Sequence, residues 1–195
     1  SGFGTDIRGT KTVSEALRKA GLDWGVRQSP VYDDNGLKIG GFSVNIREDT
    51  GTPLGIVSGR YGLVGNDEAF SFADDLFTEG VSFMYAGAFG GGRKVWLLGK
   101  LPESYSVAGD RVSPYIIFIN SHDGSSGVKA AMTPVRVVCS NMINLALRNA
   151  ERIWTARHTG NIRERIADAK ETLLTAEGYM RELKAEAESL ALKRL

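Results

Sequence analysis

The sequence predicts an α+β fold: a mainly antiparallel, strand-rich core with flanking helices and a long C-terminal amphipathic helix. Three observations predict this class. Apolar segments of strand length are separated by Gly- and Asp-rich turns over much of residues 24–139. Two segments before residue 80 have the periodicity and terminal residues of helices. Residues 162–190 carry apolar side chains at alternating spacings of four and three.

The N-terminal part is predicted to form a helix followed by three strands. The helix spans residues 13–20 and ends at Gly21, because glycine adopts the left-handed conformation that closes many helices. The turn at 33–36 ends in Asn-Gly, which favours a tight hairpin. The predicted strands are 24–32, 37–46 and 54–58.

The middle of the chain is predicted to form one helix and then mostly strands. Asn66 is placed to cap a helix over residues 67–78, with acidic residues in its first turn. The three glycines at 90–92 are typical of an exposed hairpin tip. The remaining predicted elements are strands at 81–89, 94–101, 115–120 and 128–139, and a helix from Ser140 or Asn141 to about Trp154.

The C-terminal segment predicts self-association. Its apolar positions form a heptad seam over about four heptads, with Glu, Lys and Arg on the other faces. A single helix of this length cannot bury its seam on a small sheet alone, so we expect a homo-oligomer; a helix lying along its own domain is the alternative. The organisation is thus a core at 1–160 and a helix at 161–195. The seam residues are Ile162, Ile166, Ala169, Leu173, Ala176, Met180, Leu183, Ala187 and Leu190.

Composition and charge exclude several classes of protein. No apolar run reaches the roughly 18 residues that span a bilayer, so we expect no membrane partner. Cys139 is the only cysteine, which rules out an internal disulfide and favours a cytoplasmic location. Residues 81–160 hold nine Lys and Arg against four Asp and Glu, a net charge of +5. This region is a candidate anion-facing surface, with scattered solvated charge as the alternative.

The polar residues predict no catalytic constellation, metal or cofactor. His122, His158 and Cys139 stand in unrelated contexts and lack the ligand spacing of a zinc site or the context of a thiol nucleophile. The glycine-rich stretch at 87–94 lacks the phosphate-loop spacing, and its strand–turn–strand context has no helix N-terminus. An enzyme that uses the region of His122 and His158 stays as an alternative.

Arginine, lysine and aromatic residues in and beside the strands predict a nucleic-acid site. Cations at a glycine tip next to an aromatic residue suit a phosphate backbone with stacked bases. An ordinary hairpin with Trp96 in the core is the alternative, as are ion pairs between the arginines and Glu48, Asp49 or Asp67. The residues predicted to hold phosphates are Arg47, Arg60, Arg93, Lys94 and Arg136, and those predicted to stack are Tyr61 and Trp96.

Several stretches together resemble a known family. They lie at 46–50, 54–61, 66–70, 86–96, 109–110, 120–125, 134–141 and 157–159. In order and spacing they resemble the phage/plasmid-like proteins, the domain-of-unknown-function family numbered 932, from about Trp24 to Ala169. The resemblance implies a mobile-element setting without an established activity. The strand-rich core is also similar, at the level of fold, to the single-strand annealing proteins of phages.

These observations lead to one expected function and two alternatives. We expect a non-catalytic, oligomeric protein of a phage or plasmid that binds single-stranded DNA in recombination or strand annealing. The first alternative is a protein-binding or counter-defence module without nucleic-acid affinity. The second alternative is the enzyme mentioned above.

Overall fold

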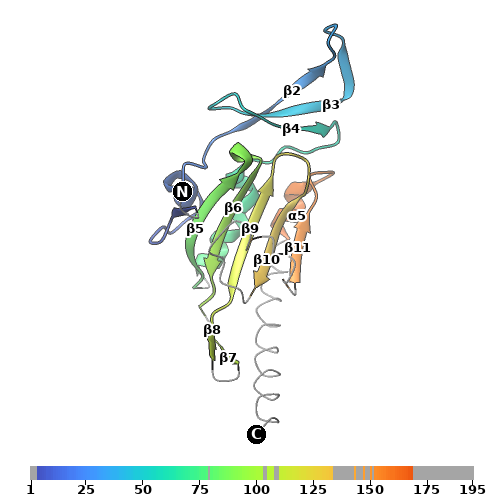
Figure 1. Cartoon of the computed structure of the whole chain (residues 1–195). Coiled ribbons are helices and arrows are strands. Elements are labelled where there is room, and N and C mark those ends of the chain that lie inside the picture. The colour runs from blue at the N-terminus through green and yellow to red at the C-terminus, as the bar shows by residue number, and fades with distance from the viewer. Residues whose placement is uncertain are drawn as a thin grey trace.

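The main body of the protein is a six-stranded antiparallel sheet (Figure 1). The computed structural model describes residues 4–78, 80–102, 105–107, 110–133, 143, 147, 150 and 152–168. The strands lie in the order β1-β5-β6-β9-β10-β11. Their bounds are Thr5–Asp6, Ser82–Phe89, Lys94–Lys100, Tyr115–Ser121, Val128–Thr133 and Arg152–Ala156. Strands β7 (Tyr105–Val107) and β8 (Asp110–Val112) form a separate two-stranded ribbon.

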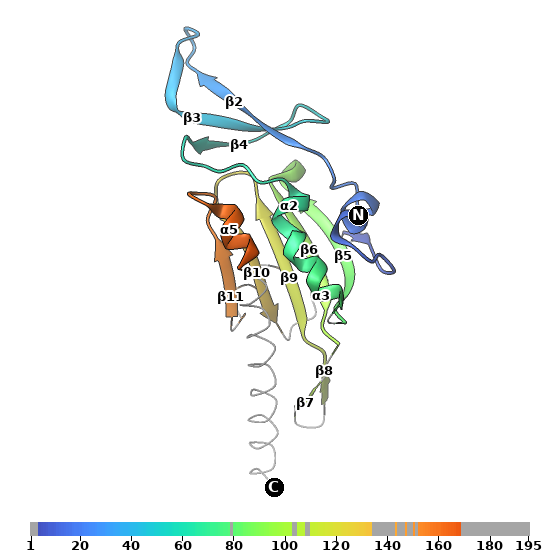
Figure 2. The same cartoon turned by 180° about the vertical axis from the view of Figure 1, so that it is seen from behind.

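Short helices pack on one face of this sheet (Figure 2). In α1, Thr12 caps the N-terminus by accepting a hydrogen bond from the amide of Glu15 at 3.1 Å. Phe118 of β9 meets the rings of Phe70 and Phe72 edge-on, with centroids 6.4 and 5.3 Å apart, so the main core lies between sheet and helices. The helical bounds are α1 Val13–Lys19, α2 Asn66–Phe70, η1 Ser71–Ala73, α3 Asp74–Thr78 and α5 Ile162–Ala167.

The opposite face of the sheet has a second apolar cluster. Trp96 of β6 and Ile117 of β9 are buried at its centre. Ile143 and Leu147, both helical, pack against this cluster from outside the sheet. Both faces of the central strands are therefore covered, which explains why β9 is a continuous apolar run without alternation.

A smaller three-stranded sheet crosses one end of the body, and we call it the arm (Figure 1). It consists of β2 (Val26–Tyr32), β3 (Lys38–Arg47) and β4 (Pro53–Ser58). The Nδ2 of buried Asn45 donates a hydrogen bond to the carbonyl of His122 at 2.7 Å, which joins the arm to the end of β9. The pairing register of β2 and β3 shifts between Pro30 and Val31.

The outer side of the arm exposes apolar side chains. Phe42 is 50% exposed and Ile56 is 62% exposed. Val44 pairs with Ile56, so both lie on the side of the arm opposite to Asn45. Tyr32 and Ile39 add exposed apolar surface near the free end of the β2–β3 hairpin.

The structure confirms the strand-rich antiparallel architecture and most of the predicted elements. The helix α1, the turn at 33–36, strand β4, and the pairings β2–β3 and β5–β6 match their predicted positions. Strands β1, β7, β8 and β11 were not expected. The strand predicted at 128–139 is described as far as Thr133, and residues 134–139 lie outside the described residues.

Two helix predictions are wrong in detail. The helix predicted over 67–78 is divided into α2, η1 and α3, and Gly65 rather than Asn66 occupies its N-cap position. Asn66 instead donates a hydrogen bond to the carbonyl of Leu22 at 2.9 Å. The helix predicted to end near Trp154 does not reach that residue, because Trp154 belongs to strand β11 and pairs with Ala130.

The C-terminal seam begins in the core of the body. Its first two positions, Ile162 and Ile166, are buried in the main apolar cluster. The seam positions from Ala169 to Leu190 lie outside the described residues, so the long helix, self-association and the division at residue 160 stay predictions. Among the helices that the structure describes, none combines the length and apolar character needed to cross a bilayer.

Candidate functional site

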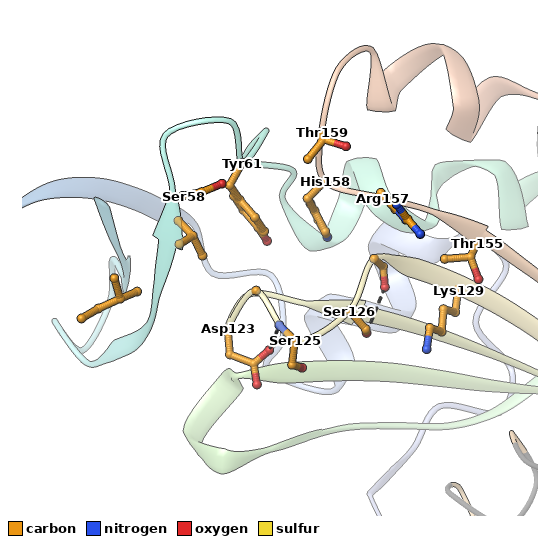
Figure 3. Close-up of a pocket in the computed structure, with 14 residues that line it drawn as sticks. Ser58, Tyr61, Asp123, Ser125, Ser126, Lys129, Thr155, Arg157, His158 and Thr159 are labelled. Carbon is orange, nitrogen blue, oxygen red and sulfur yellow. Dashed lines mark hydrogen bonds between the residues drawn. The ribbon is translucent and has the colours of Figure 1, made fainter. Parts of the chain in front are cut away.

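A pocket of about 550 Å³ lies where the arm meets the ends of β10 and β11 (Figure 3). One wall comes from β4 and Tyr61, another from the β9–β10 loop at 123–127, and a third from the end of β11 and the residues after it. Its volume is in the usual range of small-molecule sites. The polar lining consists of Ser58, Tyr61, Asp123, Ser125, Ser126, Lys129, Thr155, Arg157, His158 and Thr159.

Two glycines allow the walls of this pocket to approach one another. A Cβ on Gly55 of β4 would lie 2.7 Å from the Cα of Asp123, so the strand touches the loop backbone directly. A Cβ on Gly127 would lie 2.0 Å from the carbonyl oxygen of Ala156. Because backbone atoms cannot move aside as a flexible side chain can, these two positions require glycine for the pocket to keep its shape.

The β9–β10 loop holds Asp123 as a carboxylate. Its Oδ1 accepts hydrogen bonds from the hydroxyl of Ser121 at 2.6 Å and the amide of Ser125 at 2.9 Å. Burial alone would raise the pKa of Asp123, but these hydrogen bonds and the charge of Lys94 outweigh it and hold the pKa below its usual value. The carboxylate therefore has hydrogen-bond partners of its own within the loop.

Tyr61 and His158 form a stacked pair on the opposite wall. Their ring centroids are 4.5 Å apart and the planes are inclined by 13°. The Tyr61 hydroxyl donates to the carbonyl of Ser121 at 2.8 Å, and Nδ1 of His158 donates to the carbonyl of Gly62 at 3.0 Å. Burial raises the pKa of Tyr61 and lowers that of His158, the latter opposed by the Gly62 carbonyl. Both rings are therefore neutral at pH 7.

The positive charge of the pocket comes from neighbouring strands. Lys129 of β10 lies opposite Thr155 of β11, and Arg157 follows two residues later, so the register brings them into one pocket. Lys94 of β6 pairs with Ser121 at the same end of the sheet, close enough to affect the ionisation of Asp123. In the part of the chain that the structure describes, neither Lys129 nor Arg157 has a carboxylate ion-pair partner.

The residues predicted to bind nucleic acid are distributed over this end of the molecule. Tyr61 lines the pocket, and Lys94 is half-buried beside Asp123. Arg60 is exposed in the loop after β4, and Arg93 is exposed in the turn before β6. Arg136 lies outside the described residues.

Arg47 has a different environment from the one predicted. Its guanidinium lies 4.5 Å from the ring centroid of Trp24 and pairs with Asp49 through two contacts of 2.7 Å. This arrangement matches the ion-pair alternative and supports the base of the arm.

The glycine segment at 90–92 is not a free hairpin tip, and Trp96 is not exposed beside it. A Cβ on Gly92 would lie 2.9 Å from the ring of Trp24 and 3.5 Å from Leu54, so this turn is packed beneath the arm. Trp96 is 1% exposed, so it lies in the core, as the alternative interpretation of this hairpin proposed. Its buried ring leaves no face on which a base can stack.

His122 belongs to a buried polar cluster beneath the arm. Its Nε2 donates to Oδ1 of Asn66 at 2.8 Å, and Asn120 donates to the same oxygen at 3.3 Å. Burial and the nearby His158 lower the pKa of His122 to about 4, while the charge of Asp123 opposes this shift. Asp123 and His158 line the pocket, whereas His122 does not. The two histidines of the enzyme alternative therefore do not line the same pocket.

Sequence reasoning missed Lys129 and Arg157 as candidate site residues. Each is a single cation in or next to a strand, with no motif around it. The only sequence signal for the position of Lys129 was strand alternation, which places Lys129 on the same face of the sheet as Ala131. Within the described ranges there is no group of three or more His, Cys, Asp or Glu residues suited to hold a metal ion.

The family model named Domain of unknown function (DUF932) matches residues 53–195. The match begins at the first residue of β4 and includes every residue that lines the pocket. No curated protein and no solved structure matches the chain.

Proposed function

The chain belongs to the DUF932 family, a domain of unknown function, and for it we propose non-catalytic binding of single-stranded DNA. The setting that we propose is recombination or strand annealing in a phage or plasmid. Annealing requires that a protein hold phosphates while leaving base edges free to pair, and it requires no bound cofactor.

One observation carries the proposal: among the described residues, the positive charge of this hydroxyl-rich pocket has no ion-pair partner. Lys129 and Arg157 point into the pocket beside Ser126 and Thr155 (Figure 3). Lysine and arginine bind phosphate oxygens as charged donors, and hydroxyls add further hydrogen bonds. Part of the net positive charge of residues 81–160 is therefore concentrated at this pocket.

The proposed site is a revision of the predicted one. Lys94, Lys129 and Arg157 hold phosphates, and exposed Arg93 directly precedes the strand that begins at Lys94. Tyr61 supplies the aromatic wall. Trp96 and Arg47 are left out because the first is in the core and the second supports the arm.

Replacing Lys129 and Arg157 together by alanine should weaken DNA binding and reduce its dependence on salt. Each phosphate contact on a single strand contributes about −0.7 to the slope of log affinity against log salt concentration, because binding releases counterions. Loss of two contacts should therefore make the slope less steep by about 1.4. Fluorescence anisotropy with labelled oligothymidine over a salt series measures this slope.

The matched control removes the same charge from the helical side of the molecule. Arg18 in the last turn of α1 is exposed, and Arg163 of α5 pairs with Glu68. The Arg18→Ala, Arg163→Ala variant should keep the wild-type slope. Equal slopes in wild type and the Lys129, Arg157 variant would show that the pocket does not bind the DNA backbone.

One observation favours the protein-binding alternative: the exposed apolar surface of the arm, which includes Ile39 and Phe42. Exposed apolar surface is common at protein interfaces. Neither residue lines the pocket, so under the DNA-binding proposal a variant with serine at both positions should have the affinity for oligothymidine and the salt slope of wild type. If wild type itself has no salt-dependent affinity for DNA, the protein-binding alternative is the better account.

A further inference from the structure

The size of the pocket indicates one nucleotide rather than a length of strand. Its volume of about 550 Å³ is bounded by β4, the loop at 123–127 and the end of β11. Sites of roughly 300–1,000 Å³ hold single small molecules. The pocket is therefore suited to a terminal group of a strand or to a free nucleotide.

The charge balance indicates the ionisation state of the ligand. Lys129 and Arg157 supply the two positive charges of the lining, and Asp123 supplies one negative charge. The Oδ1 of Asp123 already accepts two hydrogen bonds within its loop, and Lys94, outside the lining, helps to stabilise the charge of this carboxylate. The two lining cations therefore remain to face a ligand, and they complement a phosphomonoester, which carries about −1.5 to −2 at neutral pH, better than an internal phosphodiester with a single charge.

The hydrogen-bond donors indicate the same group. Ser126 and Thr155 lie beside Lys129 and Arg157 in the lining, and Thr159 follows at the end of the same wall (Figure 3). A phosphomonoester presents three terminal oxygens, each able to accept more than one hydrogen bond, so it can use cations and hydroxyls that approach from several sides.

We propose that this pocket binds the phosphomonoester group of a nucleotide, either the terminal phosphate of a DNA strand or a free nucleoside monophosphate. The inference rests on the proposed function and refines it: the strand is held by its phosphorylated end at the pocket and by its backbone along the neighbouring cations. Lys129 and Arg157 bind the phosphate oxygens directly.

The test compares oligothymidines of about 20 nucleotides that differ only at their ends: a 5′-phosphate, a 3′-phosphate or hydroxyls at both ends. Loss of charge-assisted hydrogen bonds corresponds to roughly a tenfold or larger change in affinity. We therefore expect at least one phosphorylated end to bind about tenfold more tightly than the hydroxyl-ended strand. Thymidine monophosphate should compete for the site, whereas thymidine should not.

The variants Lys129→Gln and Arg157→Gln should each reduce this end preference to less than about threefold, while Arg163→Gln should preserve it. Thermal unfolding identifies any variant that fails to fold, and the wild-type comparison of strand ends does not depend on the variants.

Stronger competition by the free nucleotide than by the phosphorylated strand would identify the free nucleotide as the ligand. Equal affinity for phosphorylated and hydroxyl ends overturns the inference of a phosphomonoester site but leaves the proposed binding of the DNA backbone intact. If the protein binds no strand and no thymidine monophosphate, both the inference and the proposed function are overturned.

Discussion

Replacement of Trp96 by alanine should lower the free energy of unfolding by about 3–5 kcal/mol, the usual cost of removing a large aromatic side chain from a core. The indole is 1% exposed, and its ring packs directly on the backbone of β5. A Cβ on Gly87 would lie 2.6 Å from Cζ2 of Trp96, and Phe89 stacks at a centroid distance of 6.1 Å. Neighbours held by a sheet cannot collapse fully into the resulting cavity.

Chemical denaturation measures this change, and Tyr32→Ala is its control because Tyr32 is 56% exposed on the arm. The control should change stability by less than about 0.5 kcal/mol. Below the denaturation midpoint, the Trp96→Ala protein should keep its affinity for oligothymidine. A variant of wild-type stability that binds DNA at least tenfold more weakly would restore the stacking role that the sequence suggested for Trp96.

Acidification should destabilise the protein between pH 6.5 and pH 4, chiefly through His122. Burial lowers the pKa of His122 in the folded state to about 4, whereas a histidine in an unfolded chain titrates near 6.5. Between these values the unfolded state binds the proton and the folded state does not, so stability falls as the pH falls. The full difference corresponds to about 3 kcal/mol, present above pH 6.5 and lost by pH 4.

Denaturation curves at intervals from pH 7 to pH 4.5 measure this loss. The chain contains two histidines, so His122→Gln and His158→Gln separate their contributions. Glutamine at 122 retains a donor for Asn66 and has no proton to gain, so His122→Gln should flatten most of the slope. His158, whose pKa is also lowered by burial, should account for the remainder. A wild-type stability that is unchanged between pH 7 and pH 5 would contradict the assignment of a neutral, buried His122.

Local sequence patterns were sufficient to predict the elements whose partners are close in the chain. The hairpin around residues 33–36 and the pairing of β5 with β6 follow from turn residues and alternation. Strand β11 was missed because the apolar residues before it continue a helical periodicity up to Trp154. Its β-branched neighbours Ile153 and Thr155 favour a strand, but only pairing with β10, more than 20 residues earlier, decides the outcome.

The candidate site was harder to predict for the same reason. Lys129 and Arg157 meet because Lys129 pairs with Thr155 across the sheet, and this register is a property of the assembled strands. The glycines at 90–92 were interpreted as an exposed tip because their actual neighbour, Trp24, comes from a distant part of the chain. Composition indicated a basic region, but the positions of its charges depend on tertiary structure.

The register shift at Pro30 has a consequence for how the protein avoids aggregation. Strand β2 forms one border of the arm, where unpaired backbone groups would ordinarily recruit a strand from another molecule and begin an amyloid-like stack. Pro30 lacks an amide hydrogen, so it cannot donate to a strand added along that border. Beside it, β3 carries three extra residues between Ile39 and Ser43, and such a bulge bends the hairpin away from a flat, regular edge. A projecting sheet with an apolar outer side is thereby protected against open-ended polymerisation through its first strand.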